Sequence, residues 1–440
     1  VNRILDSEKR KYVENRKRNK QIIANELKKG TPETEALLKL YDSKGVTPEE
    51  IDQYAKENSL TRIDIPDNFY SLVSERQQQR EQTTQTKRKE SVPVSENIPK
   101  TTILYYDDWK TEQFSSIVVE VVREPESRKQ YVILDKTAFY PTSGGQQNDH
   151  GTLDGYAVLD CIKQGKHVLH VLDDNEYFEK KKLSGEQVTG LINMKRRKLL
   201  TQHHTSTHII NGAAKEVLGS HVWQAGAAKS ESKGRLDITH FDALSQDELM
   251  KIEEKANEII KQEIPITKTV LPRDEAEKRY GFRLYQGGAV PGQEVRVVDI
   301  PGFDVEACGG THLNNTAEAE MIRILKSTKV QDGIVRIEFT AGDAAKEEDE
   351  KSGNLVSEAS ELLDCEEDQL PARAQELFTK WKKAKKKKLP LEEFELSATE
   401  TTDGDPLAET AAILKTQPEH IVKTIKKFKD QLEKFKQKVS

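Results

Sequence analysis

The sequence predicts an α+β protein of several domains, because segments of different character follow one another along its 440 residues. Residues 1–90 are polar and read as helical, with a linker to residue 100, whereas residues 101–190 hold short strands with no helix between them. Residues 191–340 mix amphipathic helix with strands, and residues 341–440 read as helical again. A chain of this length holds roughly two to four domains.

The composition is that of a charged protein whose core is concentrated in part of the chain. Hydrophobic residues make up 35% and charged residues 33%. No apolar run has the length of a membrane helix, and the charged N-terminus does not resemble a signal peptide, so we expect a cytoplasmic protein. The net charge is −6, so any nucleic-acid binding must come from local basic patches. The first residue is Val1, so either a non-AUG start is translated literally or the chain is a piece of a larger protein.

The helical N-terminal segment and its linker are recognised from local signals. Thr47-Pro-Glu-Glu50 has the form of a helix start, with a capping hydroxyl and Pro at the first helical position. From Arg76 to Pro99 the chain is rich in Gln, Thr, Lys, Ser and Pro and almost lacks apolar residues, which is typical of a linker.

Short apolar runs then predict a small β-barrel or sandwich within residues 101–190. Successive runs without intervening helices favour these two architectures. The predicted strands are Ile103–Tyr106, Ser116–Val122, Tyr131–Leu134, Tyr156–Ile162 and His167–Leu172.

The mixed segment that follows is predicted to start with a helix at Lys195-Arg-Arg-Lys198. Leu249–Gln262 has the periodicity of an amphipathic helix, and Val295–Ile300 and Gly333–Phe339 read as strands. Arg196 and Arg197 are candidate phosphate contacts, and a solvated helix end is the alternative interpretation.

The C-terminal helices end in a heptad pattern. Its apolar positions are Ile421, Ile425, Phe428, Leu432, Phe435 and Val439. Two interpretations stay open: packing against the preceding helix, or an interface with a partner, including dimerisation with a second copy of the chain.

Two short clusters carry the chemistry. His204-Thr-Ser-Thr-His208 places two imidazoles four residues apart, which on a helix puts both on one face. Cys308-Gly-Gly-Thr-His312 supplies a thiol and a third imidazole at the same spacing. Three imidazoles and one thiolate suit Zn²⁺ best among common metals. The three cysteines cannot form a disulfide framework, which fits a reducing compartment.

Polar residues in other motifs are candidates for the walls of a pocket near this metal. The first His is not followed by the Glu of a metalloprotease, so peptide hydrolysis by that route is disfavoured. Glycines at 144, 145, 309 and 310 allow close approach of backbone to a ligand. Thr137 presents a hydroxyl, and Gln146 and Gln224 offer both a donor and an acceptor to a substrate.

These motifs together resemble the editing domain of alanyl-tRNA synthetases and its free-standing relatives. The resemblance covers roughly residues 101–340 and rests on Thr137–Gln146, His204–His208, Gln224–Gly226 and Cys308–His312, in the family's order and spacing. Leu40–Gly45, followed by Gln77–Arg80, resembles the end of the tRNA-recognition domain of the archaeal form. The helical tail is similar to that form too, so the chain resembles the C-terminal half of the synthetase.

The resemblance implies hydrolysis of Ser-tRNA(Ala) and Gly-tRNA(Ala), with His204, His208, Cys308 and His312 as zinc ligands. It implies that Thr137, Gln146 and Gln224 serve the reaction, that Gly144, Gly145, Gly309 and Gly310 border the substrate, and that Asp42 reads the acceptor stem. The family's ATP-binding catalytic core has no counterpart here. Aminoacylation, and with it ATP, is therefore expected only with a separate or upstream catalytic domain, which would be a partner together with tRNA(Ala).

The sequence leaves two alternatives to this function. A tRNA-binding scaffold with a structural zinc would need no hydrolysis, and a closed four-ligand site would favour it. The related zinc domain of threonyl-tRNA synthetases is disfavoured by the Phe139–Gln146 signature and by the strand-rich segment before the histidine pair.

Overall fold

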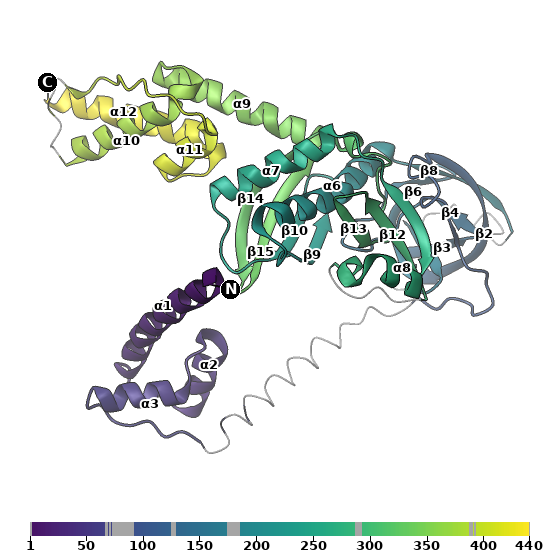
Figure 1. Ribbon diagram of the computed structural model, residues 1–440, viewed down its shortest axis with the longest axis horizontal. Coiled ribbons are helices and arrows are strands. Elements are labelled where there is room, and N and C mark those ends of the chain that lie inside the picture. Colours follow the sequence, from purple (N-terminus) through teal and green to yellow (C-terminus); the bar gives the residue numbers. More distant parts are fainter. Residues whose placement is uncertain are drawn as a thin grey trace.

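The computed structural model describes residues 2–66, 69, 72, 92–124, 129–173, 185–286, 293–386, 390 and 393–439. Figure 1 shows a group of N-terminal helices, a central body that contains the strands, and a group of C-terminal helices. The predicted α+β class, with helices at both ends and a barrel between them, is confirmed. The domain boundaries stay predictions. No helix in the described part of the chain is both long and apolar enough to cross a bilayer.

The N-terminal helices are α1 (Asn2–Leu27), α2 (Thr34–Lys44) and α3 (Pro48–Glu57). As predicted, the Thr47 side chain caps α3, Glu50 completes a capping box, and Pro48 is the first helical residue. A small apolar core that includes Ile23, Leu37 and Ile51 holds the three helices together. The Gln77–Arg80 part of the predicted recognition segment lies outside the described residues.

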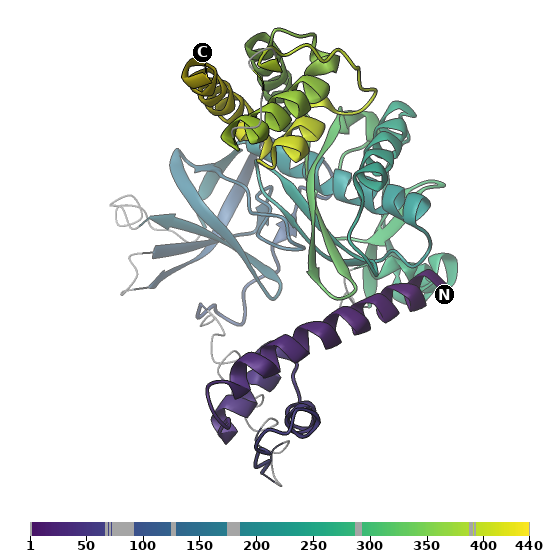
Figure 2. The same cartoon turned by 90° about the vertical axis from the view of Figure 1, so that its left-hand side faces the viewer.

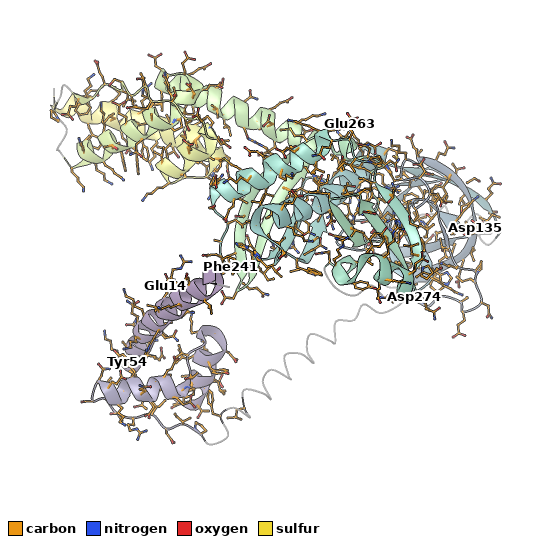
Figure 3. The ribbon with its side chains drawn as sticks, in the orientation of Figure 1. Glu14, Tyr54, Asp135, Phe241, Glu263 and Asp274 are labelled. Atoms are coloured by element: carbon orange, nitrogen blue, oxygen red, sulfur yellow. The ribbon has the colours of Figure 1, made fainter. Side chains whose placement is uncertain are left out.

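One end of α1 approaches the central body (Figure 2). Arg10 forms an ion pair with Asp242 at 2.8 Å, and a groove of about 880 Å³ lies between the helix and residues 240–248. Glu14 and Phe241, both labelled in Figure 3, are among the residues that line this groove.

Strands between Gln113 and Ile192 close into a barrel, so the predicted choice between a barrel and a sandwich is settled in favour of the barrel. Phe114, Val132, Phe139, Leu153 and Cys161 are buried in its core. Around the barrel the order is β2 (Gln113–Glu124), β3 (Lys129–Leu134), β7 (His167–Asp173), β6 (Tyr156–Gln164), β5 (Gly151–Leu153) and β8 (Gln187–Ile192).

The predicted strand Ile103–Tyr106 is wrong beyond its first residue. A short β1 (Thr102–Ile103) pairs in parallel with β4 (Lys136–Thr137), and the chain then turns. The amides of Asp107 and Asp108 both donate to the carbonyl of Leu104, and this turn removes the tyrosines from the extended run. Asp is common in turns because its side chain competes for backbone hydrogen bonds.

The central body continues with two helices that pack against a four-stranded sheet, as Figure 1 shows. The helices are α6 (Met194–Leu218) and α7 (Gln246–Lys261), and the sheet order is β14 (Ile322–Gln331), β15 (Ile334–Ala341), β10 (Gly234–Thr239) and β9 (Gln224–Lys229). Ile209, Ile210, Ile252, Ile337 and Phe339 belong to the core between them.

A smaller sheet supports the second metal motif. Its strands are β11 (Thr267–Pro272), β12 (Glu294–Ile300) and β13 (Asp304–Ala307), with α8 (Arg273–Tyr280) and the 3₁₀ turn η1 (Phe282–Leu284) beside them. Another 3₁₀ turn, η2 (Thr316–Ala319), leads into β14. The three elements predicted from periodicity in this segment are present as α7, β12 and β15.

The C-terminal helices form a separate apolar core. They are α9 (Asp343–Leu363), α10 (Leu370–Lys385), α11 (Pro406–Leu414) and α12 (Ile421–Val439), with 3₁₀ turns η3 (Glu367–Gln369) and η5 (Pro418–His420). Ile421 and Ile425 have no exposed surface, and Phe428 stacks on Trp381 of α10. The seam from Ile421 to Leu432 therefore packs inside the chain, in line with the first of the two interpretations. An interface with a partner stays a prediction.

Candidate metal centre

The first pair of candidate ligands lies in the middle of the buried helix α6. The helix begins after Asn193, whose side chain accepts a hydrogen bond from the amide of Arg196. Every residue from Leu199 to Ala214 is buried, so the helix is enclosed on all sides there. His204 and His208, one turn apart, therefore project from a rigid support and not from a loop.

The second pair lies in the loop after β13, and the loop is held from several directions. The Arg296 guanidinium donates to the carbonyls of Cys308 (2.9 Å) and Gly310 (3.0 Å). The Tyr106 hydroxyl donates to the carbonyl of Gly309, and the Lys268 ammonium donates to that of His312. These contacts fix the loop that carries Cys308 and His312.

The four side chains converge. One ligating atom from each of His204, His208, Cys308 and His312 lies within 4.8 Å of all the others. The Cys308 sulfur is 3.3 Å from Nε2 of His204 and 3.3 Å from Nε2 of His312. In a tetrahedral zinc site with ordinary bond lengths, S and N ligands are about 3.5 Å apart. The three imidazoles are almost fully buried, whereas Cys308 is partly exposed.

Each imidazole faces a polar group on the side away from the cluster. His204 Nδ1 is 2.7 Å from Oε1 of Gln146, an oxygen that can only accept, so Nδ1 carries the proton and Nε2 keeps its lone pair for a metal. His312 Nδ1 is 3.2 Å from the hydroxyl of Thr205. Such partners orient metal-binding histidines and select their tautomer.

The third imidazole meets a carboxylate. Within the part of the chain that the structure describes, His208 Nδ1 and Asp304 Oδ2 are both buried without a hydrogen-bond partner, and they face each other at 3.6 Å. A metal on Nε2 would leave the proton on Nδ1, directed at Asp304, which is the usual carboxylate–histidine arrangement of zinc sites. The orphaned pair therefore fits a metal on the opposite nitrogen.

Glu306 is a further acidic residue of this centre that the sequence analysis did not single out. Its Oε2 is 3.6 Å from His208 Nε2, and its Oε1 accepts from the Asn211 amide at 2.9 Å. Burial raises the pKa of this carboxyl to about 8, although His208 opposes the shift. Acidic residues at 304 and 306, alternating along a strand that ends directly before Cys308, are the signal that could have identified it.

The Cys308 thiol is suited to act as a thiolate ligand. Burial by itself would raise its pKa, but the nearby His204 and His312 outweigh this effect and hold the pKa well below its usual range. The thiolate is the form that binds metal.

Two of the predicted glycines are needed for close approach. A Cβ on Gly310 would lie 2.0 Å from Cε1 of His204, and a Cβ on Gly145 would lie 2.1 Å from the carbonyl oxygen of Ala227. Gly144 and Gly145 have φ of 55° and 74° and form the centre of a tight turn from Ser143 to Gln146. Gly144 and Gly309 are exposed beside the cluster.

The three residues predicted to serve the reaction differ in the groups that they contact. Gln146 is fully buried, and its side chain contacts His204 and Thr311, which indicates a positioning role. The Thr137 hydroxyl is also buried, accepts from the Phe139 amide and lies 2.7 Å from Nε2 of His170, so none of these contacts is with the metal cluster. The Oε1 of Gln224 is buried and has no hydrogen-bond partner among the described residues, as expected of a side chain that awaits a ligand.

The predicted phosphate contacts on α6 require correction. Arg197 has no exposed surface, forms a two-pronged ion pair with buried Asp149 and also donates to the carbonyls of Trp109 and Ala138. Arg196 is 7% exposed and binds Glu231 together with the Asn148 carbonyl. A guanidinium enclosed in this way cannot reach a nucleic-acid phosphate. Arg196 and Arg197 instead hold α6 against residues 148 and 149, and Arg196 also holds it against the turn after β9. Asp42 lies on α2 and is half-buried.

Comparisons with known proteins place the chain among tRNA synthetase sequences. Residues 1–196 match the family model "tRNA synthetases class II (A)", and residues 295–338 match "Threonyl and Alanyl tRNA synthetase second additional domain". The chain is similar to the alanine–tRNA ligases of Methanococcus maripaludis strain C5 (37% identity), Methanothermobacter thermautotrophicus (40%) and Pyrococcus abyssi (39%). These matches cover 87%, 86% and 87% of the chain. The chain spans 42%, 41% and 42% of the length of these relatives.

Proposed function

We propose that this chain, which belongs to the alanyl-tRNA synthetase family, holds Zn²⁺ between His204, His208, Cys308 and His312 and hydrolyses mischarged Ser-tRNA(Ala) and Gly-tRNA(Ala) there. The observation that carries the proposal is the convergence of the two ligand pairs, with a polar partner behind each imidazole. Bound zinc would supply a positive charge that polarises the ester or its attacking water.

The choice of substrates follows from the limited ability of an alanine-binding pocket to reject other small amino acids. A pocket that accepts alanine cannot exclude the smaller glycine by size, and it rejects serine only weakly because serine adds a single hydroxyl. A second, hydrolytic site is the general solution to such errors. The free Oε1 of Gln224 is a suitable acceptor for a serine hydroxyl, which alanine lacks.

The activity of the whole enzyme is part of the proposal as well. The chain would act on tRNA(Ala), with Asp42 of α2 at the acceptor stem, and aminoacylation with ATP would need a separate or upstream catalytic domain. The exposed basic residues of α1, which include Lys9, Arg10 and Arg16, make that helix the better candidate for contact with the catalytic part, because the heptad seam of α12 is largely buried.

A deacylation assay tests the hydrolytic function directly. The chain is incubated with Ser-tRNA(Ala), Gly-tRNA(Ala) and correctly charged Ala-tRNA(Ala), with and without a chelator. We expect release of serine and glycine, little release of alanine, and loss of hydrolysis after the metal is removed. Equal survival of all three esters in the presence of zinc would contradict the proposal.

A tRNA-binding scaffold with structural zinc is the second candidate. It is favoured by the four protein ligands, since catalytic zinc usually keeps one position open. On this reading the chain would bind tRNA(Ala) and lose stability on chelation, yet leave Ser-tRNA(Ala) intact.

A mixing experiment tests whether the chain works together with a separate catalytic half. The chain and an N-terminal catalytic half of the enzyme should elute as one complex in size-exclusion chromatography and should charge tRNA(Ala) only together. Independent elution without charging would mean that the chain acts alone, as an editing hydrolase.

A further inference from the structure

Lys229 is a buried lysine beside the candidate metal centre that the proposed mechanism does not yet use. It is the last residue of β9 and is 2% exposed. Its amide donates to the carbonyl of Gly145 at 2.7 Å, and its carbonyl accepts from Gln147 at 3.1 Å. The lysine is therefore tied by its backbone to the Ser143–Gln146 turn that borders His204.

The ammonium of Lys229 has few acceptors for a buried cation. Within the described part of the chain, its hydrogen-bond acceptor is the carbonyl of Gly144, at 3.2 Å. An ammonium has three N–H donors, and a buried charge without partners is costly. Other lysines nearby are better supplied: Lys198 contacts two carboxylates, and Lys268 contacts three oxygens.

The residue that accepts from this ammonium lies beside the metal centre. This residue, Gly144, lies against the ring of His204: a Cβ there would be 4.0 Å from Cε1. Burial lowers the pKa of Lys229 to about 8, although Cys308 and Glu306 oppose the shift. Among the described residues, the ammonium thus has N–H groups to spare and lies beside the turn that borders His204.

We infer that Lys229 binds the carbonyl oxygen of the ester that this site hydrolyses, and that it stabilises the negative charge that develops there. The inference rests on the proposed deacylation. In that step the water oxygen forms a bond to the carbonyl carbon, and the π electrons move to the carbonyl oxygen. The carbonyl double bond then re-forms as the bond from that carbon to the ribose oxygen breaks, and the ribose oxygen takes up the proton that the water has lost. Lys229 would donate to the charged oxygen throughout and would keep its own proton.

A purely structural role for Lys229 makes different predictions. As a counter-charge to Cys308 and Glu306, the lysine would stabilise the folded metal site in the absence of substrate. Its loss would then lower zinc content or thermal stability. As a substrate contact, its loss would leave both unchanged, because the ammonium has a single acceptor among the residues that the structure describes.

The test compares Lys229→Met with Lys233→Met in the full zinc-loaded chain. Lys233 lies in the turn between β9 and β10, directly before β10, and its exposed ammonium pairs with Glu338. We expect Lys229→Met to lower kcat for Ser-tRNA(Ala) by about 100-fold or more, the loss typical of a missing oxyanion donor, with KM changed less than threefold. Zinc content and Tm should stay at the parental values. Lys233→Met should match the parent in all respects.

A binding measurement gives a second readout. Isothermal titration compares an adenosine analogue that carries a serine-derived anionic phosphonate with a neutral seryl amide of 3′-amino-adenosine. Lys229→Met should weaken binding of the phosphonate about 100-fold and that of the amide less than threefold.

Several outcomes would overturn the inference. A kcat within threefold of the parent, an equal effect on both analogues, or a fall in zinc content or Tm would each do so. A parental chain that does not deacylate Ser-tRNA(Ala) would remove the proposed function, and this inference with it. A parental chain that deacylates, together with an unaffected Lys229→Met variant, would remove the inference alone.

Discussion

Gly310 lies directly against the ring of His204, so that a methyl group on Gly310 would be 2.0 Å from Cε1 of that imidazole. The two residues come from the two metal motifs, which are far apart in the sequence. Their contact allows the loop after β13 to approach α6 closely enough for Cys308 to reach the histidine pair. A side chain at 310 would separate the two halves of the site.

Gly310→Ala is accordingly expected to damage the metal site. The added methyl must displace the His204 ring, and we expect zinc affinity to fall by about 100-fold, as when ligand orientation is disturbed. Gly309→Ala is the matched control, because a Cβ there would meet the hydroxyl of Tyr106 at 3.3 Å and no metal ligand. Competition with a chromophoric chelator measures both affinities. Equal affinities would show that the loop can move away from α6.

Removal of a ligand should remove the metal. Cys308→Ala is expected to lower zinc content and to abolish deacylation, and Tm should fall because bound metal stabilises the fold. Cys365→Ala is the control, since Cys365 lies at the end of α9, among the C-terminal helices. Elemental analysis of both proteins gives the zinc stoichiometry. A full complement of zinc in Cys308→Ala would exclude this residue from the site.

Gln146→Ala tests the positioning role assigned above. Without the amide oxygen, Nδ1 of His204 loses its acceptor, and we expect zinc affinity to fall by about 10- to 100-fold. Gln147→Ala alters the exposed neighbour and should bind zinc like the parent. If Gln146 instead acted only on substrate, kcat would fall while zinc affinity stayed the same.

Gln224→His should slow hydrolysis of Ser-tRNA(Ala) while zinc content is maintained. The change removes a buried oxygen for which the described residues supply no partner, so the loss should appear in the reaction, by about tenfold or more. Gln262→His, at the exposed end of α7, is the control. A parental rate of deacylation in Gln224→His would remove Gln224 from the pocket.

Arg197→Met should destabilise the protein without a specific effect on tRNA binding. It leaves Asp149 buried without its guanidinium, and breaking such a pair costs about 3–5 kcal/mol of unfolding free energy. Lys195→Met, on the exposed side of the same helical turn, should change stability by less than about 0.5 kcal/mol. Urea denaturation measures both. If Arg197→Met is as stable as the parent but binds tRNA poorly, Arg197 is a tRNA contact and not a structural residue.

The secondary structure could be predicted where one local pattern dominates. The amphipathic period of α7, the apolar runs of β3, β6 and β7 and the capping signal of α3 were all sufficient. β5 has only three residues, and β8 alternates buried Val188, Gly190 and Ile192 with exposed residues that include the apolar Leu191. Both strands depend on pairing with each other to close the barrel, and no local pattern shows such pairing.

The interpretation of charged residues depended on burial. Lys195-Arg-Arg-Lys198 reads as a basic patch, yet Arg197 is enclosed by Asp149 and by two carbonyls from distant segments. Lys229 gave no signal in the sequence, because a lysine at a strand end is ordinarily exposed. In both cases the decisive fact is which distant groups surround the side chain.

The sequence by itself determined the ligand types and their four-residue spacing, since a helix brings positions i and i+4 to one face whatever surrounds it. It also determined the α+β class, through hydrophobic periodicity. Only the tertiary structure decided that His204, His208, Cys308 and His312 meet, that Gln146 stands behind His204, and that the heptad seam is largely covered by the chain itself. The physical reason is that spacing and periodicity are local properties of the backbone. Burial, and the pairing of groups far apart in the chain, exist only once the sheets, the barrel and α6 have packed together.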